Sequence, residues 1–177
     1  MGCINFVASS ETPDFQNKLK DIGNIVKGED FSYSGHVILC KCVQVIDGDT
    51  IRIAFRQNYT PFPLQLKVRL SGIDTPEMKP RLNNPHREEI KEKANAAKKF
   101  VIEALERSPL GPNVIVVRFF NNDKYGRPLV DIYSSLTINE AQELLEGKEL
   151  NLKSLNQILI EEGHANGYDG GHKSDFV

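Results

Sequence analysis

Residues 69–77, Arg-Leu-Ser-Gly-Ile-Asp-Thr-Pro-Glu, mark the point at which a predicted strand ends and a charged turn begins. Just before this point every second residue is apolar: Leu64, Leu66, Val68 and Leu70. Such alternation is typical of a half-buried strand, because successive side chains point to opposite faces. It therefore predicts that Arg69 lies on the face opposite to the apolar set.

The turn that follows this strand carries two carboxylates, Asp74 and Glu77, on either side of a proline. Pro76 fixes its own φ and restricts the backbone of Thr75, so the Thr75 carbonyl can be held in one direction. Carboxylates and backbone carbonyls are the ligands that hard cations prefer. The turn is therefore a candidate cation site.

The segments on both sides of the turn show strand and helix periodicity. Upstream, alternating apolar residues between Tyr33 and Phe55 predict two strands, and Asp47-Gly48 between them is a strong hairpin signal. Downstream, the predicted elements are a helix from Asn84-Pro85 to Leu105, strands over Val114–Phe120 and Leu129–Tyr133 with a turn at 121–127, and helices over Ile138–Glu146 and Leu152–Glu162.

This order of elements predicts an α+β fold built on a five-stranded Greek-key β-barrel of the oligonucleotide-binding (OB) type. One helix follows the third strand, and further helices lie on the C-terminal side. A β-sandwich can give the same order of strands. Residues 1–32 are expected to form an N-terminal arm that can hold one short helix, and residues 33–177 to form the domain.

The bulk composition places few limits on function. The formal net charge is -2, whereas nucleic-acid-binding proteins are more often basic, so nucleic acid would have to be gripped by a local basic cleft. The three cysteines give no disulfide framework and no zinc-ligand spacing.

The N-terminus bears on localisation. It lacks the charged region and apolar run of a secretory signal, which leads us to expect a cytoplasmic protein. Gly2 and Cys3 stand where dual acylation acts, although Phe6 occupies the position at which myristoylation favours Ser or Thr. Membrane contact is expected only if this terminus is lipidated.

Three short clusters concentrate acids and arginines at the predicted strand ends: residues 47–50, 69–77 and 123–127. Phosphodiester cleavage needs an activated water and neutralisation of the charge that builds on the phosphoryl oxygens. A cation held by carboxylates can supply part of that charge, and arginines can clasp the phosphate. The spacing therefore suggests Asp49 and Asp74 for a metal, Glu77 for the water, and Arg69 with Arg127 for the phosphate.

The three clusters resemble the signature motifs of the staphylococcal nuclease (thermonuclease) family, in that family's order. They read Val-Ile-Asp-Gly-Asp-Thr at 45–50, Arg-Leu-Ser-Gly-Ile-Asp-Thr-Pro-Glu at 69–77 and Asp-Lys-Tyr-Gly-Arg at 123–127. The likeness extends over roughly residues 34–171, with differences in loops.

The resemblance implies an OB-type barrel and a Ca²⁺-dependent endonuclease that hydrolyses DNA and RNA on the 5′-oxygen side and leaves 3′-phosphate ends. It implies that Asp49, Asp74 and the Thr75 carbonyl bind one Ca²⁺, with Mg²⁺ or another divalent ion as an alternative. Single-stranded nucleic acid is the expected substrate of a monomer. The remaining implied roles are Glu77 for the attacking water, Arg69 and Arg127 for the scissile phosphate, and Lys124 and Tyr125 for a neighbouring phosphate and sugar.

The C-terminal part departs from the family pattern. Tyr168 lies about one residue from the position of a base-stacking aromatic, with Asp169 in the nearer slot, and is still a candidate for stacking on a base. Residues 135–153 look like an insertion, and His164 and His172 are expected on the surface. Two other functions stay open: a non-catalytic module that binds nucleic acid or protein, and a membrane-attached regulator based on Gly2 and Cys3.

Overall fold

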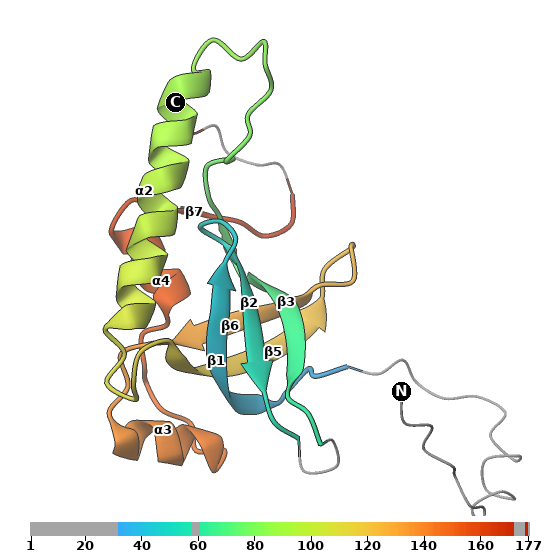
Figure 1. Cartoon of the computed structure of the whole chain (residues 1–177), viewed down its shortest axis with the longest axis vertical. Helices are drawn as coiled ribbons and strands as arrows, with labels where there is room; N and C mark the ends of the chain where they lie inside the picture. The colour runs from blue at the N-terminus through green and yellow to red at the C-terminus, as the bar shows by residue number, and fades with distance from the viewer. Residues whose placement is uncertain (1–31, 58–60, 172–175, 177) are drawn as a thin grey trace, which may run out of the picture. The chain divides into compact units, whose positions relative to one another are not determined.

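The computed structural model describes residues 32–57, 61–171 and 176, and its centre is a closed barrel of five strands (Figure 1). Neighbouring strands follow the order β1-β2-β3-β6-β5, where β3 and β6 run parallel and the other pairs are antiparallel. The strands are β1 (Val37–Val45), β2 (Thr50–Phe55), β3 (Leu64–Leu70), β5 (Val114–Asn122) and β6 (Pro128–Tyr133). The predicted α+β fold with an OB-type barrel is confirmed.

The barrel closes around the alternating apolar residues that the sequence pattern singles out. Ile51, Ile53 and Val68 are fully buried, and Phe55 packs against Phe119 inside the barrel. Because side chains alternate along a strand, the intervening residues of β2 and β3 face outward. The core thus fixes which polar side chains reach the outer surface.

In the described ranges three helices pack against the barrel: α2 (Arg87–Glu106), α3 (Ile138–Leu145) and α4 (Leu155–Glu161). α2 buries a stripe of residues three or four apart, and it contacts β1, whereas α4 contacts β6 (Figure 1). Thr137 and Ser154 cap α3 and α4 with capping boxes, so α4 begins three residues later than the predicted start at Leu152. None of the helices in the described ranges is long and apolar enough to span a bilayer.

A second, very small sheet was not predicted. β4 (Ile73–Asp74) pairs with β7 (Asn166–Gly167) in an antiparallel ladder, although the sequence indicated a loop for the second segment. Two residues are too few to show alternation, which explains why the pattern missed this pairing. The predicted N-terminal helix lies outside the described residues.

Candidate active site

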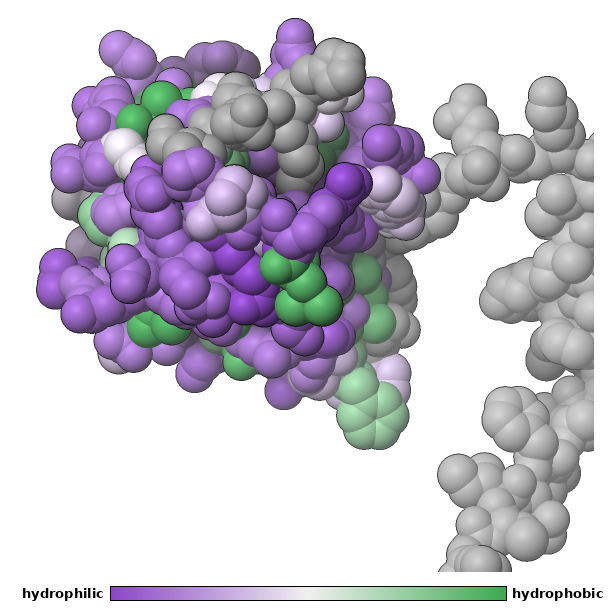
Figure 2. Space-filling model, turned by 90° about the horizontal axis from the view of Figure 1, so that it is seen from above, coloured by the Kyte–Doolittle hydropathy of each residue, from purple (hydrophilic) through white to green (hydrophobic). Residues whose placement is uncertain are grey.

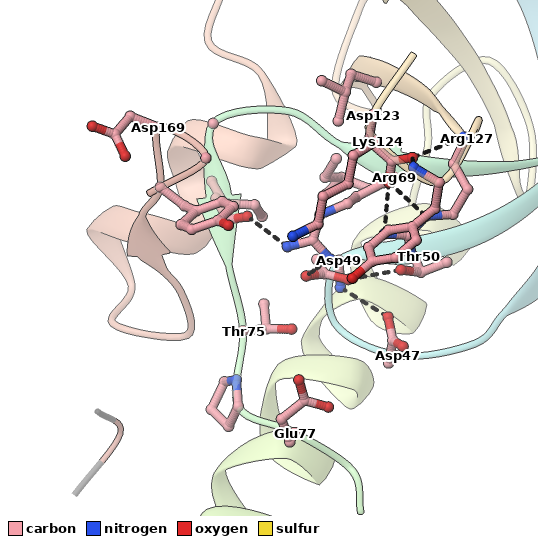
Figure 3. Close-up of a pocket in the computed structure, with 18 of the residues that line it drawn as sticks. Asp47, Asp49, Thr50, Arg69, Thr75, Glu77, Asp123, Lys124, Arg127 and Asp169 are labelled. Atoms are coloured by element: carbon pink, nitrogen blue, oxygen red, sulfur yellow. Dashed lines mark hydrogen bonds and ion pairs between the residues drawn. The ribbon is translucent and has the colours of Figure 1, made fainter. Parts of the chain in front are cut away.

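A cleft of about 640 Å³ opens at one end of the barrel, where four segments distant in sequence meet (Figure 3). These are the β1–β2 turn, the segment from β3 to Met78, the β5–β6 hairpin and residues 168–170. Eight of the nine predicted site residues line it: Asp49, Arg69, Thr75, Glu77, Lys124, Tyr125, Arg127 and Tyr168. The predicted set therefore converges on one cavity.

The exception is Asp74, which lies under Arg69 rather than on the cleft wall. Nη1 of Arg69 lies 2.5 Å from Oδ2 of Asp49, and its Nη2 lies 3.0 Å from Oδ1 of Asp74. Asp49 is 5% exposed and Asp74 only 2%. One guanidinium thus joins two buried carboxylates.

Burial shapes the acid–base chemistry of this cluster. It raises the pKa of Asp49 to about 6, although the Arg69 charge and a 2.7 Å hydrogen bond donated by the Thr50 hydroxyl both favour the carboxylate. Burial also opposes the charge of Arg69, but Asp49 and Asp74 outweigh it and raise the pKa of Arg69. Asp47 adds further negative charge beside Asp49, so the region holds more acid than one arginine can neutralise.

A glycine allows the β1–β2 turn to lie close to Thr75. A Cβ at Gly48 would stand 2.9 Å from Cγ2 of Thr75 and 3.0 Å from Cβ of Ala97. β1 and β2 pair antiparallel on either side of this turn, so the hairpin signal at Asp47-Gly48 is confirmed, but the glycine is required here by close packing. This contact places the Asp49 segment against the start of the Thr75–Glu77 turn.

Glu77 follows Pro76 out of β4 and is exposed on the cleft wall. In the view of Figure 3 it is drawn below Thr75, further from the arginines than Thr75. A carboxylate in that position can accept a proton from a water in the cleft.

The β5–β6 hairpin presents Arg127 through a compact turn centred on Asp123. Oδ1 of Asp123 accepts hydrogen bonds from the backbone N–H groups of Tyr125 and Arg127 at 2.8 and 2.9 Å. Oδ2 of Asp123 lies 2.7 Å from both Nε and Nη2 of Arg127. Burial would raise the pKa of Asp123, but these bonds and the guanidinium outweigh it and lower the pKa.

Two aromatic residues complete the walls. The ring of Tyr125 is exposed near Lys124 and Arg127, with the cations 5.2 and 5.6 Å from its centroid. The backbone N–H of Tyr168 donates to the Gly72 carbonyl at 2.9 Å, and its ring centroid lies 6.0 Å from Cζ of Arg69. Asp169 points away from the arginines (Figure 3), so Tyr168 is the residue of this pair that faces them.

The predictions for the two histidines have different outcomes. His164 is half-buried and packs against Phe100 of α2, with ring centroids 4.7 Å apart. His172 lies outside the described residues. The prediction of a surface position was therefore only partly right for His164.

Sequence patterns missed a buried residue that supports the site from below. Nδ2 of Asn156 donates to the carbonyls of Ser71 and Val130 at 2.9 Å and lies 3.0 Å from Oδ1 of Asp131. The Ser71 hydroxyl donates to the same Asp131 oxygen at 2.6 Å. Asn156 thus ties the turn between Arg69 and Asp74 to β6, and no local signal in α4 predicts these partners.

The donor atoms around Asp49 suit a hard cation. Within the described residues, no three His, Cys, Asp or Glu side chains form a ligand group. A cation at Asp49 and Asp74 would need a backbone carbonyl, as from Thr75, and water to complete its shell. An all-oxygen set of this kind fits Ca²⁺, which accepts six to eight oxygen ligands in flexible geometry.

The cleft belongs to a polar end of the molecule. Figure 2 shows that the described surface seen from above is mostly hydrophilic, with apolar residues in separate spots. Arginines, carboxylates and exposed aromatic rings in one cleft suit an anionic ligand that also has flat rings.

Comparison with known proteins agrees with this chemistry. The family model described as staphylococcal nuclease homologue matches residues 67–175, more than half of the chain. The uncharacterized protein MJ1439 of Methanocaldococcus jannaschii is 27% identical in an alignment that covers 94% of this chain and 75% of that protein. The matched family range holds Arg69, Glu77, Arg127 and Tyr168. The chain therefore belongs to the staphylococcal nuclease homologue family, whose domains are generally nucleases or nucleic-acid-binding modules.

Proposed function

We propose that this protein is a Ca²⁺-dependent endonuclease that hydrolyses DNA and RNA and leaves 3′-phosphate and 5′-hydroxyl ends. The observation that carries the proposal is the meeting of Arg69, Glu77 and Arg127 in one cleft, above two buried carboxylates. Those groups match what an in-line attack of water on a phosphodiester requires: a proton acceptor and positive charge around the phosphoryl oxygens.

Glu77 takes the proton from the attacking water in this mechanism. The water oxygen forms a bond to phosphorus as the bond between phosphorus and the 5′ oxygen breaks, and the departing oxygen takes up a proton from solvent. Arg127, presented by its hairpin, and Arg69, at the base of the cleft, bind the phosphoryl oxygens and stabilise the charge that builds there. The guanidinium of arginine is planar and can bind two phosphoryl oxygens at once.

Asp49, Asp74 and the Thr75 carbonyl are the residues that would hold Ca²⁺, with Mg²⁺ as the alternative ion. When bound, the ion supplies additional positive charge beside the phosphate. In this proposal Lys124 and Tyr125, which line the cleft, contact the next phosphate and sugar, and Tyr168 stacks on a base. A ring stacks on any base, so little sequence preference is expected.

The test is cleavage of end-labelled single-stranded DNA and RNA with Ca²⁺, with Mg²⁺ and with a chelator. We expect Ca²⁺-dependent cleavage that yields 3′-phosphate ends, detected by the failure of the products to serve as primers until phosphatase is added. Glu77→Gln should lower the rate by at least about a hundredfold, within the range of general-base catalysis. The matched control is Glu92→Gln, an exposed glutamate of α2 outside the cleft.

Two outcomes would contradict the proposal. Absence of cleavage with every ion would contradict the proposed nuclease activity. Binding of oligonucleotides without cleavage would identify a non-catalytic module of the same fold. Full activity of Glu77→Gln would leave the nuclease in place but reject Glu77 as its base.

A further inference from the structure

The outer face of β1, β2 and β3 carries charges of one sign only. These three strands contain no acidic residue, although acids slightly outnumber bases in the chain, 24 to 22. We call the four outward basic residues of this sheet the basic face: Lys41, Arg52, Lys67 and Arg69.

The basic face is continuous with the cleft. Thr50 pairs with Arg69 across β2 and β3, and both line the cleft. Arg52 pairs with Lys67 in the same register two residues further along. Side chains two apart on a strand point to the same side, roughly 7 Å apart, so this second pair adds basic side chains next to Arg69 on the outer face of the sheet.

The pair of Arg52 and Lys67 is unfavourable for the protein alone. Like charges directly opposite one another on neighbouring strands are destabilising. In the described part of the chain neither residue has an ion pair with an acid. Basic residues often protect a sheet edge, but these strands belong to a closed barrel and have no edge to protect. An anionic ligand would relieve their repulsion.

The segment that carries α3 and α4 contrasts in charge with this face. Residues 135–162, which include α3 and α4, contain six glutamates and two lysines. A polyanion is repelled there and attracted to the basic face. Exposed Leu39 and Val43 of β1, at 48% and 46%, add apolar area beside the basic residues on which bases can lie. A ligand that offers both phosphates and bases would fit this face, and a nucleic-acid strand has both.

We propose that a single-stranded nucleic acid continues from the cleft across β3 and β2, with Arg52 and Lys67 each binding one of its phosphates. This inference rests on the proposed function for the strand in the cleft. It adds a binding subsite several ångströms away from the reacting groups, one that only substrates longer than the cleft can reach.

The test compares the wild type with the double variant Arg52→Gln/Lys67→Gln. Binding of a fluorescent 20-nucleotide single strand is followed by anisotropy in chelator, across a series of salt concentrations. Removal of each phosphate-binding cation should flatten the slope of log K against log salt by about 0.7, so the slope of the double variant should be shallower by about 1.4. Affinity at low salt should fall about tenfold. With Ca²⁺, kcat/KM should fall more for the 20-mer than for a dinucleotide.

Two controls make the result specific. Lys148→Gln/Lys153→Gln removes the same charge from the acidic segment with α3 and α4 and should keep the wild-type slope. Arg52→Lys, which retains the charge, should keep most of the slope that Arg52→Gln removes. Circular dichroism verifies that every variant is folded.

The outcomes separate this inference from the proposed function. A slope and affinity equal to those of the wild type, or an equal loss in the lysine control, would overturn the basic face as a nucleic-acid subsite. Loss of binding only to phosphatidylserine vesicles would also overturn it and would indicate a membrane surface. A lowered slope in a protein that cleaves nothing would support the subsite while rejecting the nuclease. Cleavage with an unchanged slope would do the reverse.

Discussion

Arg69 and Arg127 have the same predicted role, but they lie in very different surroundings. Arg69 comes from the rigid end of β3, and its side chain is 12% exposed between two carboxylates that are more deeply buried. Arg127 comes from a hairpin, is 26% exposed, and pairs with one carboxylate four residues away. The first arginine is part of the structural base of the site, and the second is carried on a local turn.

The difference has a consequence for how each arginine can bind phosphate. The charge of Arg69 is already engaged by Asp49 and Asp74. Its contribution to phosphate binding therefore depends on whether those carboxylates also hold a cation. The charge of Arg127 is engaged by Asp123 alone, in a turn that closes without help from the rest of the barrel. Arg69 should therefore matter for stability and catalysis, and Arg127 mainly for catalysis.

The largest expected effect is on catalysis, and we expect it when either arginine is replaced. Arg69→Ala and Arg127→Ala each remove charge from the phosphoryl oxygens, so each should lower kcat/KM by two to three orders of magnitude, about 3–4 kcal/mol. Steady-state cleavage of a dinucleotide measures this. Arg107→Ala, an exposed residue paired with Glu103 at the end of α2, serves as the control. A tenfold or smaller loss in either variant would contradict its assigned role.

Stability should separate the two arginines. Arg69→Ala leaves two buried carboxylates without their counter-cation, which should lower the free energy of unfolding by about 3 kcal/mol. Arg127→Ala breaks a partly exposed pair and should cost less than about 1 kcal/mol. Urea denaturation in chelator measures both. Added Ca²⁺ should recover part of the loss in Arg69→Ala, because an ion that binds only the folded state stabilises it. Equal losses of unfolding free energy in the two variants would contradict the proposed difference between the two arginines.

The glycines of the two turns offer a smaller test of the same contrast. Gly48→Ala forces a methyl group against Thr75 and Ala97, which should cost about 1–3 kcal/mol by overpacking. Gly126→Ala meets no atom within 4 Å but must adopt a φ of +78°, a cost of about 1 kcal/mol. Only Gly48→Ala should also lower Ca²⁺ affinity, measured by calorimetry. Lower affinity in Gly126→Ala as well would mean that the hairpin contributes to the ion site.

The smallest effect concerns pH and the Arg127 turn. Because the pKa of Asp123 is lowered in the folded protein, its stabilising effect is complete above the ordinary value near 3.8 and disappears as pH falls through the lowered value. Carboxyl NMR should therefore find Asp123 ionised at pH 4, with Asp123→Asn used to assign the signal. Titration at or above 3.8 would show that the turn does not hold the carboxylate as described.

Much of the fold follows from local sequence, for local reasons. Alternation in β2 and β3, the Asp-Gly turn at 47–48, and Ser and Thr caps act over a few residues, so they can be read without knowing the rest of the chain. The three charged clusters likewise contain the residues that meet in the cleft, since each cluster ends a strand and a barrel brings strand ends together.

The tertiary structure alone decided how those residues are related. That Asp74 lies beneath Arg69, that Gly48 is needed for packing on Ala97, and that Asn156 supports Ser71 all depend on contacts between segments far apart in the chain. The basic face depends on register, because Arg52 and Lys67 become neighbours only when β2 and β3 pair. Sequence determines which side chains each strand offers to its two faces, and closure of the barrel determines which of them share a site.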